Sequence, residues 1–520
     1  MFPLLAVRPL ARLCAVLAVL AALAACGLTP PAPATLRVLA TPELAGIEPL
    51  LADLRADTGI DLQLDMGHGL DAVGALRPGV YEHDAAWLSS DRYFHLELAE
   101  SGYAGPRPPS TSIMLSPVAV GMKPAVAARL RTDGPISWAD LAASAAAGEL
   151  RFGMAEPRRS GSGLAALVGV ATAAAGSGRA LQPEDVTCDR LRGLLTGHVL
   201  RADGSAALVD GFVAREPELD ALVASESTLL SLNATGRLAE PLEIVYPTDG
   251  IIQSDFPLLL LDPAHRDAYD RVVEWLLTEP VQRRIMELTA RRPIDPDVAR
   301  LPQLPATTGN ALYFPDRLDV VDALLADYEA MQTRPPGHTI FLLDFSGSMR
   351  GDRIAALRTA FAELTGTGDA SFVRFYAGER VTVARFGSEV LAEREFAAGD
   401  PAELAALRNF VGAEEFDEST AVWSAAEHGY GIATRTLAAD PATPVSIVLM
   451  TDGLSNAGLT ADELIDRQNA PGRPAVPLFT IRVGEADAAE LARVATATGG
   501  RAVDAGTDLS HAFEELRGCR

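Results

Sequence analysis

The sequence predicts an α/β protein of more than one domain. A chain of 520 residues is too long for a single hydrophobic core. From Leu36 to about Asp295, short apolar runs alternate with segments of helical periodicity, as in sheets whose strands are connected by helices. A second series of this kind begins near Pro336. With 48% hydrophobic and 22% charged residues, the composition is that of a globular protein.

The first series contains seven apolar runs with the length of strands. Helical periodicity is found at Ile47–Thr58 and Ala264–Leu277, and a third helix is expected at Leu164–Ala175 after a loop rich in Ser and Gly. The predicted strands are Leu36–Ala40, Ile60–Leu64, Ala85–Leu88, Ser116–Gly121, Leu150–Met154, Leu242–Tyr246 and Pro257–Leu261.

Residues 1–25 have the features of a targeting segment. Arg8 and Arg12 precede the apolar stretch Leu13–Ala22, which is too short to span a membrane comfortably. The segment ends in Leu-Ala-Ala and is followed by Cys26, and these four residues resemble the lipobox of bacterial lipoproteins. That resemblance implies that Cys26 carries lipid and anchors the chain to the extracytoplasmic face of the cell membrane. The alternative is an ordinary signal peptide that happens to contain a cysteine.

Residues 26–35 are rich in proline and are expected to form an extended tether. Cys188 and Cys519 remain after removal of the signal peptide; a disulfide between them and two free thiols are both open. The formal net charge of -25 argues against nucleic acid as a partner.

Small hydroxyl residues follow several of the predicted strands. They are well placed for a ligand, because open α/β sheets bind ligands beyond the carboxyl ends of their strands. Free backbone N–H groups at a helix N-terminus would favour an anion, and two neighbouring arginines, Arg158 and Arg159, would add positive charge. Ordinary turns and helix caps use the same residue types. The candidate residues are Thr41, Ser89, Ser90, Ser160 and Ser162.

Several segments of the region 36–295 together form a recognisable series. They are Thr41 after the first strand, the segments Asp84–Ser90, Pro157–Gly163, Tyr246–Gly250 and Asp255–Leu258, and the tail Val281–Pro293. With this series the region resembles bacterial extracellular solute-binding proteins of the type 2 periplasmic-binding fold. The resemblance implies two lobes that close over a small solute, here expected to be anionic. It places one hinge crossing near Ser116–Gly121 and the return near Leu242–Gly250.

Residues 296–335 are predicted to be a connector. Prolines interrupt its first half, and Leu318–Met331 has the pattern of one amphipathic helix.

The region 336–517 contains a pattern that indicates a metal site. The buried strand Thr339–Leu343 leads directly into Asp344, Ser346 and Ser348, and a helix with apolar residues at helical spacing follows. A carboxylate and two hydroxyls at such a turn suit a small hard cation, which prefers oxygen ligands. Thr420 opens a helix over Ala421–Leu437, and Asp452 follows the buried strand Val445–Met450.

This order of motifs resembles the metal-ion-dependent adhesion site of von Willebrand factor type A (VWA) domains, which have a doubly wound, Rossmann-like fold. The resemblance implies that Asp344, Ser346, Ser348 and Thr420 bind Mg2+, or alternatively Mn2+ or Ca2+, and that Asp452 acts through water. A carboxylate from a protein partner would then complete the coordination. Thr420 departs from the family pattern, because Glu418 and Ser419 precede it instead of glycine, in an acidic loop.

The sequence therefore predicts a membrane-anchored binding and adhesion protein that is not an enzyme. The alternatives are the solute-binding subunit of an ABC importer and a metal-dependent hydrolase. The hydrolase is disfavoured because the sequence contains neither a GxSxG nor an HExxH motif.

Overall fold

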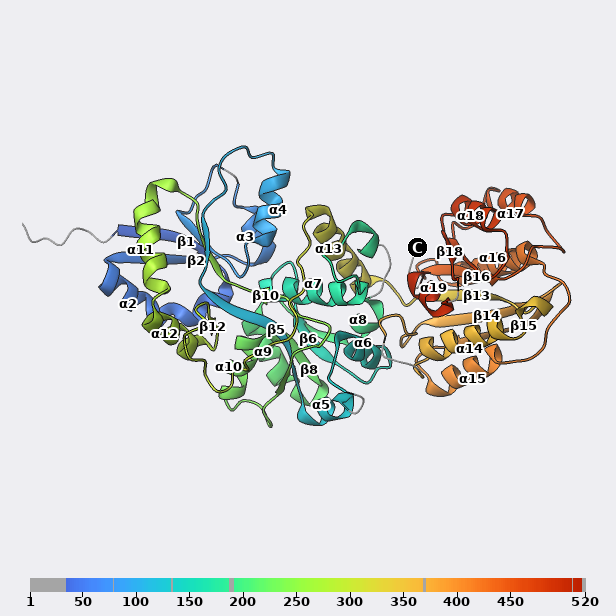
Figure 1. Ribbon diagram of the computed structural model, residues 1–520, viewed down its shortest axis with the longest axis horizontal. Coiled ribbons are helices and arrows are strands. Elements are labelled where there is room, and N and C mark those ends of the chain that lie inside the picture. The colour runs from blue at the N-terminus through green and yellow to red at the C-terminus, as the bar shows by residue number, and fades with distance from the viewer. Residues whose placement is uncertain are drawn as a thin grey trace, which may run out of the picture.

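The computed structural model describes residues 34–77, 79–131, 134–186, 191–367, 371–506 and 508–516. The predicted signal peptide, with Cys26, and the two remaining cysteines, Cys188 and Cys519, lie outside these ranges. Three sheets follow one another along the molecule, two in the N-terminal module and one in the C-terminal module (Figure 1). Among the described helices, none combines the length and the apolar character needed to cross a membrane. The predicted α/β class is confirmed.

The first lobe is built on a five-stranded sheet with the order β2-β1-β3-β11-β4. β1 pairs in parallel with β2 and β3, whereas β11 runs antiparallel to β3 and β4. Helices α2, α11 and α12 cover one face, and α3 and α4 cover the other, so the central strands are apolar on both sides. The elements are β1 (Ala34–Ala40), η1 (Pro42–Ile47), α2 (Glu48–Thr58), β2 (Ile60–Met66), α3 (Gly69–Gly74), β3 (Ala85–Trp87), α4 (Arg92–Glu100), β4 (Ser110–Ser112), β11 (Pro257–Leu260), η5 (Pro263–His265), α11 (Arg266–Leu276) and α12 (Glu279–Thr289).

The second lobe is built on a seven-stranded sheet around β5, β8, β6 and β7. Helices α6 and α7 pack on one face of this sheet, and α9 and α10 pack on the other. The elements are β5 (Met114–Met122), α5 (Pro124–Leu130), α6 (Trp138–Ala146), β6 (Phe152–Ala155), α7 (Gly161–Ala175), η3 (Pro183–Val186), α8 (Arg192–Thr196), β7 (His198–Ala202), α9 (Ser205–Ala214), η4 (Glu216–Glu218), β8 (Ala221–Ser225), α10 (Glu226–Ala234), β9 (Glu243–Val245), β10 (Gln253–Ser254) and β12 (Arg292–Pro293).

The chain crosses between the lobes from β4 to β5 and returns between β10 and β11. The first crossing lies just before the predicted Ser116–Gly121, because Val118–Met122 already pair with β8 inside the second lobe. The return lies beyond the predicted Leu242–Gly250, because β9 in that range pairs with β5 inside the second lobe. The return passes through Phe256, which has a left-handed φ of 42°. Trp87 Nε1 donates to the Phe256 carbonyl at 3.0 Å, and the Arg291 guanidinium lies 4.6 Å from the Phe256 ring. These contacts hold a conformation that costs a non-glycine residue free energy.

The connector joins the two lobes to each other as well as to the rest of the chain. Its helix α13 (Leu318–Thr333) contacts α4 of the first lobe and η3 of the second. Val321, Leu325 and Tyr328 are buried in a hydrophobic core that also contains residues of both lobes. Arg192 of α8 donates to two carbonyls near the end of α13, those of Met331 at 2.7 Å and Arg334 at 2.6 Å.

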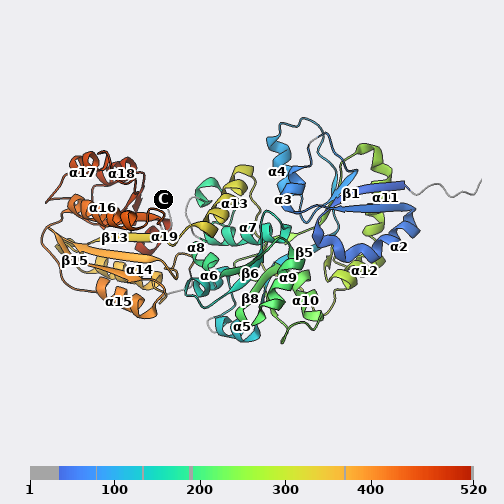
Figure 2. The same cartoon turned by 180° about the vertical axis from the view of Figure 1, so that it is seen from behind.

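The C-terminal module has a six-stranded sheet with the order β15-β14-β13-β16-β17-β18, parallel except for β15. Helices α14, α15 and α19 pack on one face and α16, α17 and α18 on the other, which is the predicted doubly wound fold. The module lies beyond the second lobe (Figure 2), where Ala377 N donates to Ala146 O at 2.8 Å. The elements are β13 (His338–Asp344), η6 (Gly347–Met349), α14 (Asp352–Leu364), β14 (Arg380–Phe386), β15 (Val390–Ala397), α15 (Pro401–Val411), α16 (Val422–Ala439), β16 (Val445–Thr451), α17 (Ala461–Gln468), β17 (Leu478–Arg482), α18 (Ala488–Ala497), β18 (Ala502–Asp504) and α19 (Leu509–Leu516).

Candidate functional sites

Asp344 is the last residue of β13, and its side chain is fully buried. One carboxylate oxygen accepts a hydrogen bond from Ser346 N at 2.7 Å, and the other accepts from Thr451 Oγ1 at 2.6 Å. Burial raises the pKa of Asp344, and the Asp452 carboxylate raises it further, whereas the hydrogen bonds from Thr451 and Ser346 lower it. Because β13 lies between β14 and β16, this carboxylate is fixed near the middle of the carboxyl edge of the sheet.

The two serines and the second aspartate lie in one hydrogen-bonded row beside Asp344. The turn η6 brings Ser346 Oγ and Ser348 Oγ within 3.0 Å of each other. Ser348 Oγ donates in turn to Asp452 Oδ1 at 2.7 Å, because Asp452 follows the neighbouring strand β16. The structure therefore brings the turn that contains Ser346 and Ser348 next to Asp452, which lies about a hundred positions later in the sequence.

Thr420 lies against the same group. Its backbone N–H donates to Asn456 Oδ1 at 2.9 Å, and its side chain is buried. A Cβ added at Gly453 would lie 3.5 Å from Thr420 Oγ1 and 3.9 Å from Ser348 Oγ, so both hydroxyls border this glycine. The Glu-Ser sequence before Thr420 does not prevent the threonine from reaching the site.

The donor atoms fit a hard divalent cation, since two carboxylates and three hydroxyls offer only oxygen. One residue that the sequence analysis missed lies beside them. Arg353, in the first turn of α14, forms an ion pair with Asp452 and donates to the Ser348 carbonyl at 3.2 Å. Its position five residues after Ser348, on a predicted helix, was the signal that could have identified it.

The acidic loop before Thr420 divides into exposed and anchored residues. Glu414, Glu415 and Glu418 are exposed, and Glu414 and Glu415 form ion pairs with Arg358 and Arg385, each at 3.5 Å. Asp417 instead accepts a hydrogen bond from Ser388 N at 2.9 Å, and its own N–H donates to the Phe345 carbonyl at 2.9 Å. Asp417 thus attaches the loop to the segment that contains Ser346.

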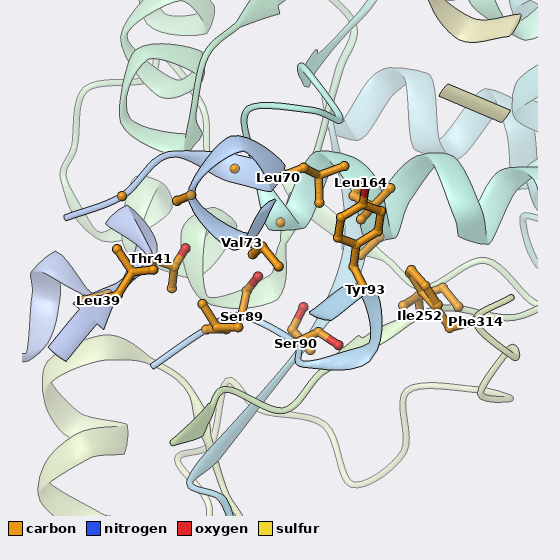
Figure 3. Close-up of a pocket in the computed structure, with 18 of the residues that line it drawn as sticks. Leu39, Thr41, Leu70, Val73, Ser89, Ser90, Tyr93, Leu164, Ile252 and Phe314 are labelled. Carbon is orange, nitrogen blue, oxygen red and sulfur yellow. The ribbon is translucent and has the colours of Figure 1, made fainter. Parts of the chain in front are cut away.

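In the N-terminal module, three predicted residues line a small cavity between the lobes. Figure 3 shows Thr41, Ser89 and Ser90 along this cavity, with apolar side chains such as Tyr93 and Leu164 on its other side. Its volume is about 50 Å3, and Phe314 of the connector is one of the residues that line it. The cavity is therefore largely apolar, with hydroxyl groups on one side.

Ser160 and Ser162 lie beside this cavity at the start of α7. The helix begins at Gly161, three positions before the predicted Leu164, so Ser162 is in the first turn rather than in a loop. Ser160 is the N-cap, and its Oγ accepts from Gly163 N at 3.4 Å. A Cβ at Gly161 would lie only 1.8 Å from Ser89 Oγ, so the two lobes are in direct contact here and the cleft is closed.

The two arginines of this loop do not supply free positive charge to the cleft. Arg158 forms an ion pair with Glu329 of α13, and Arg159 forms one with Asp71 of the first lobe at 3.1 Å. Arg291, which the sequence analysis did not select, is a buried cation at the cleft. Burial lowers the pKa of Arg291 to about 10. Together with Glu43, it lines a second cavity of about 370 Å3 between the lobes.

Comparison with known proteins identifies both modules. Residues 36–287 match the family model of bacterial extracellular solute-binding proteins, and residues 339–517 match that of the von Willebrand factor type A domain. No curated protein sequence matches the chain.

Similar solved structures include binding proteins and a VWA protein. Iron-bound HitA from Pseudomonas aeruginosa is 18% identical with a TM-score of 0.45, covering 57% of this chain and 99% of its own. The periplasmic binding protein AfuA from Actinobacillus pleuropneumoniae, with fructose-6-phosphate bound, is 13% identical with a TM-score of 0.45, covering 58% and 99%. A von Willebrand factor type A protein from Catenulispora acidiphila is 20% identical with a TM-score of 0.29, covering 35% and 42%. The two family-model matches show that the chain contains a domain of the bacterial extracellular solute-binding family at residues 36–287 and a VWA domain at residues 339–517.

Proposed function

We propose that the protein is a lipid-anchored extracytoplasmic binding protein, not an enzyme, whose VWA domain binds a protein partner through a divalent cation. The observation that supports this most strongly is the group of five oxygen-bearing side chains at the carboxyl edge of β13 and β16. Mg2+ is the preferred ion, with Mn2+ and Ca2+ as alternatives. The lipid anchor at Cys26 would hold the protein on the outer face of the cell membrane.

The residues of the VWA site have different roles in this proposal. Asp344 and the hydroxyls of Ser346, Ser348 and Thr420 would hold the ion directly, and Asp452 would act through water. When bound, the ion supplies an electrophilic centre for a carboxylate of the partner. Since three of the four direct ligands are neutral hydroxyls, little of the positive charge is cancelled, which favours an incoming anionic ligand.

The solute-binding domain would take a small solute between its lobes, with an anion as the favoured class. This rests on the hydroxyl groups of Thr41, Ser89 and Ser160 and on the N-terminus of α7, a 15-residue helix.

The metal site is tested by replacing its most buried ligand in the full chain. We expect Asp344→Ala to abolish Mg2+ and Mn2+ binding measured by calorimetry. Asp352→Ala, which removes an exposed acid from the nearby helix α14, is the matched control and should bind like the wild type. Without metal, Asp344→Ala should melt at or above the wild type, because it removes a buried charge that faces Asp452. Unchanged Mg2+ affinity in Asp344→Ala would rule out the site.

A further inference from the structure

Glu43 places a negative charge where the proposed anionic solute would bind. This residue lies on η1, directly after the first strand and Thr41. One of its carboxylate oxygens accepts a hydrogen bond from the Thr41 hydroxyl, and the other accepts from Ser160 Oγ at 3.0 Å. Since Thr41 belongs to the first lobe and Ser160 to the second, the Glu43 carboxylate bridges the two lobes of the closed cleft.

The hydroxyl groups around Glu43 form a buried row. Ser160 Oγ lies 3.0 Å from Ser162 Oγ, and Ser162 Oγ lies 3.4 Å from Ser205 Oγ. Ser160 is 2% exposed and Ser162 is 5% exposed. The row begins at the N-cap of α7 and ends at the first residue of α9. Hydroxyl donors and helix N-termini are the groups that bind an oxyanion in proteins, and here the Glu43 carboxylate accepts hydrogen bonds from two such hydroxyls, those of Thr41 and Ser160.

A hydrogen bond from Arg291 to the backbone of Glu43 holds this residue in position. Arg291 donates from Nη2 to the Glu43 carbonyl oxygen. The Arg291 guanidinium is itself fixed against the Phe256 ring, 4.6 Å from its centroid. Glu43 also borders the cavity of about 370 Å3, which offers space into which its side chain can withdraw.

We propose that Glu43 is a specificity-determining residue that acts as an internal competitor of anionic solutes. This inference rests on the proposed solute-binding function of the cleft. An oxyanion can use the hydroxyls of Thr41 and Ser160 only when the Glu43 carboxylate leaves them, because two negative charges in one partly dehydrated site repel each other. The apparent affinity for an anion therefore equals the intrinsic affinity multiplied by the fraction of molecules in which Glu43 has left the site.

The experiment measures the binding of sulfate and inorganic phosphate to the full chain by titration calorimetry at constant ionic strength. We expect Glu43→Ala to bind at least one of them at least tenfold more tightly than the wild type. Glu48→Ala removes an exposed acid at the start of α2 and should leave the affinity unchanged. Glu43→Gln keeps the size of the side chain without its charge. If the alanine variant folds poorly, Glu43→Gln should still bind the anion more tightly than the wild type.

A double variant, Glu43→Ala with Ser160→Ala, locates the gained affinity. We expect the gain to disappear in it; a gain that persists comes from an ion bound elsewhere and overturns the inference. Equal affinity in the wild type and Glu43→Ala also overturns it, but leaves the proposed solute-binding function intact. If the wild type and every variant fail to bind either ion, both the inference and the anionic solute are rejected.

Discussion

His338 gives a quantitative prediction about the stability of the VWA domain. It begins the central strand β13 and is 1% exposed. Its Nδ1 lies 2.8 Å from Thr436 Oγ1, and its Nε2 lies 2.8 Å from Thr382 Oγ1. Burial and, to a smaller extent, the positive charge of Arg380 together lower the pKa of His338 from 6.5 to about 4. The folded domain therefore keeps this ring neutral at pH values where the unfolded chain protonates it.

The sign of the pH effect follows from this difference. Below pH 6.5 the unfolded chain binds a proton at this histidine and the folded domain does not, so stability falls as the pH decreases from 6.5 toward 4. The pKa difference corresponds to about 3 kcal/mol in total, of which about 2 kcal/mol is lost between pH 7.5 and pH 5. Above about pH 7.5 neither the folded nor the unfolded state binds a proton at His338, so the residue no longer makes stability depend on pH.

The assay compares denaturant unfolding of the wild type and His338→Gln at pH 7.5 and pH 5. Both proteins lose stability through other groups, but the wild type should lose about 2 kcal/mol more than the variant. His511→Gln, which alters a histidine whose side chain is 66% exposed, should behave like the wild type. An equal loss in the wild type and His338→Gln would refute the reasoning.

Two further predictions concern the lipid anchor and the buried ion pair between Arg292 and Glu226. Cys26→Ala should leave the chain uncleaved by lipoprotein signal peptidase and unlabelled by palmitate analogues; processing and labelling as in the wild type would contradict the lipobox prediction. Arg292→Ala should reduce the free energy of unfolding by about 3–5 kcal/mol, because Glu226, 0% exposed and paired with Arg292 at 2.6 Å, would keep a buried charge without its partner. The double variant Arg292→Ala/Glu226→Gln, measured by denaturant unfolding, should be more stable than Arg292→Ala alone. Equal stability of the two variants would show that the lost ion pair does not cause the destabilisation.

The residues of the proposed metal site could be selected from the sequence because their positions depend on local patterns. Asp344 and Asp452 each follow an apolar run, and parallel strands that end at the same edge of a sheet bring such residues together. The strands β7 and β8 were not predicted. A five-residue apolar run is compatible with a strand or with a buried helical turn, so its assignment depends on the residues around it. The longer strands β14 and β15 of the VWA domain were not predicted either.

The charged residues around both sites depend on contacts that a sequence does not display. Arg158 was expected to serve the cleft, but Glu329, on a helix 171 positions away, neutralises it. Arg291 reaches Glu43 across 248 positions. Such pairs are set by how lobes and connector pack, and this packing follows from the shapes of whole surfaces rather than from a motif.

The position of α13 has a thermodynamic consequence for the whole molecule. Its buried side chains, such as Leu325 and Tyr328, share one core with both lobes, and only four residues separate its end from β13 of the VWA domain. Separating the lobes would expose part of that core, at about 1.5–3 kcal/mol for each large apolar side chain removed from it. If opening also shifts the VWA domain, solute and partner become linked ligands. Each would then change the affinity for the other by the same factor, because a coupling free energy between two binding sites is reciprocal.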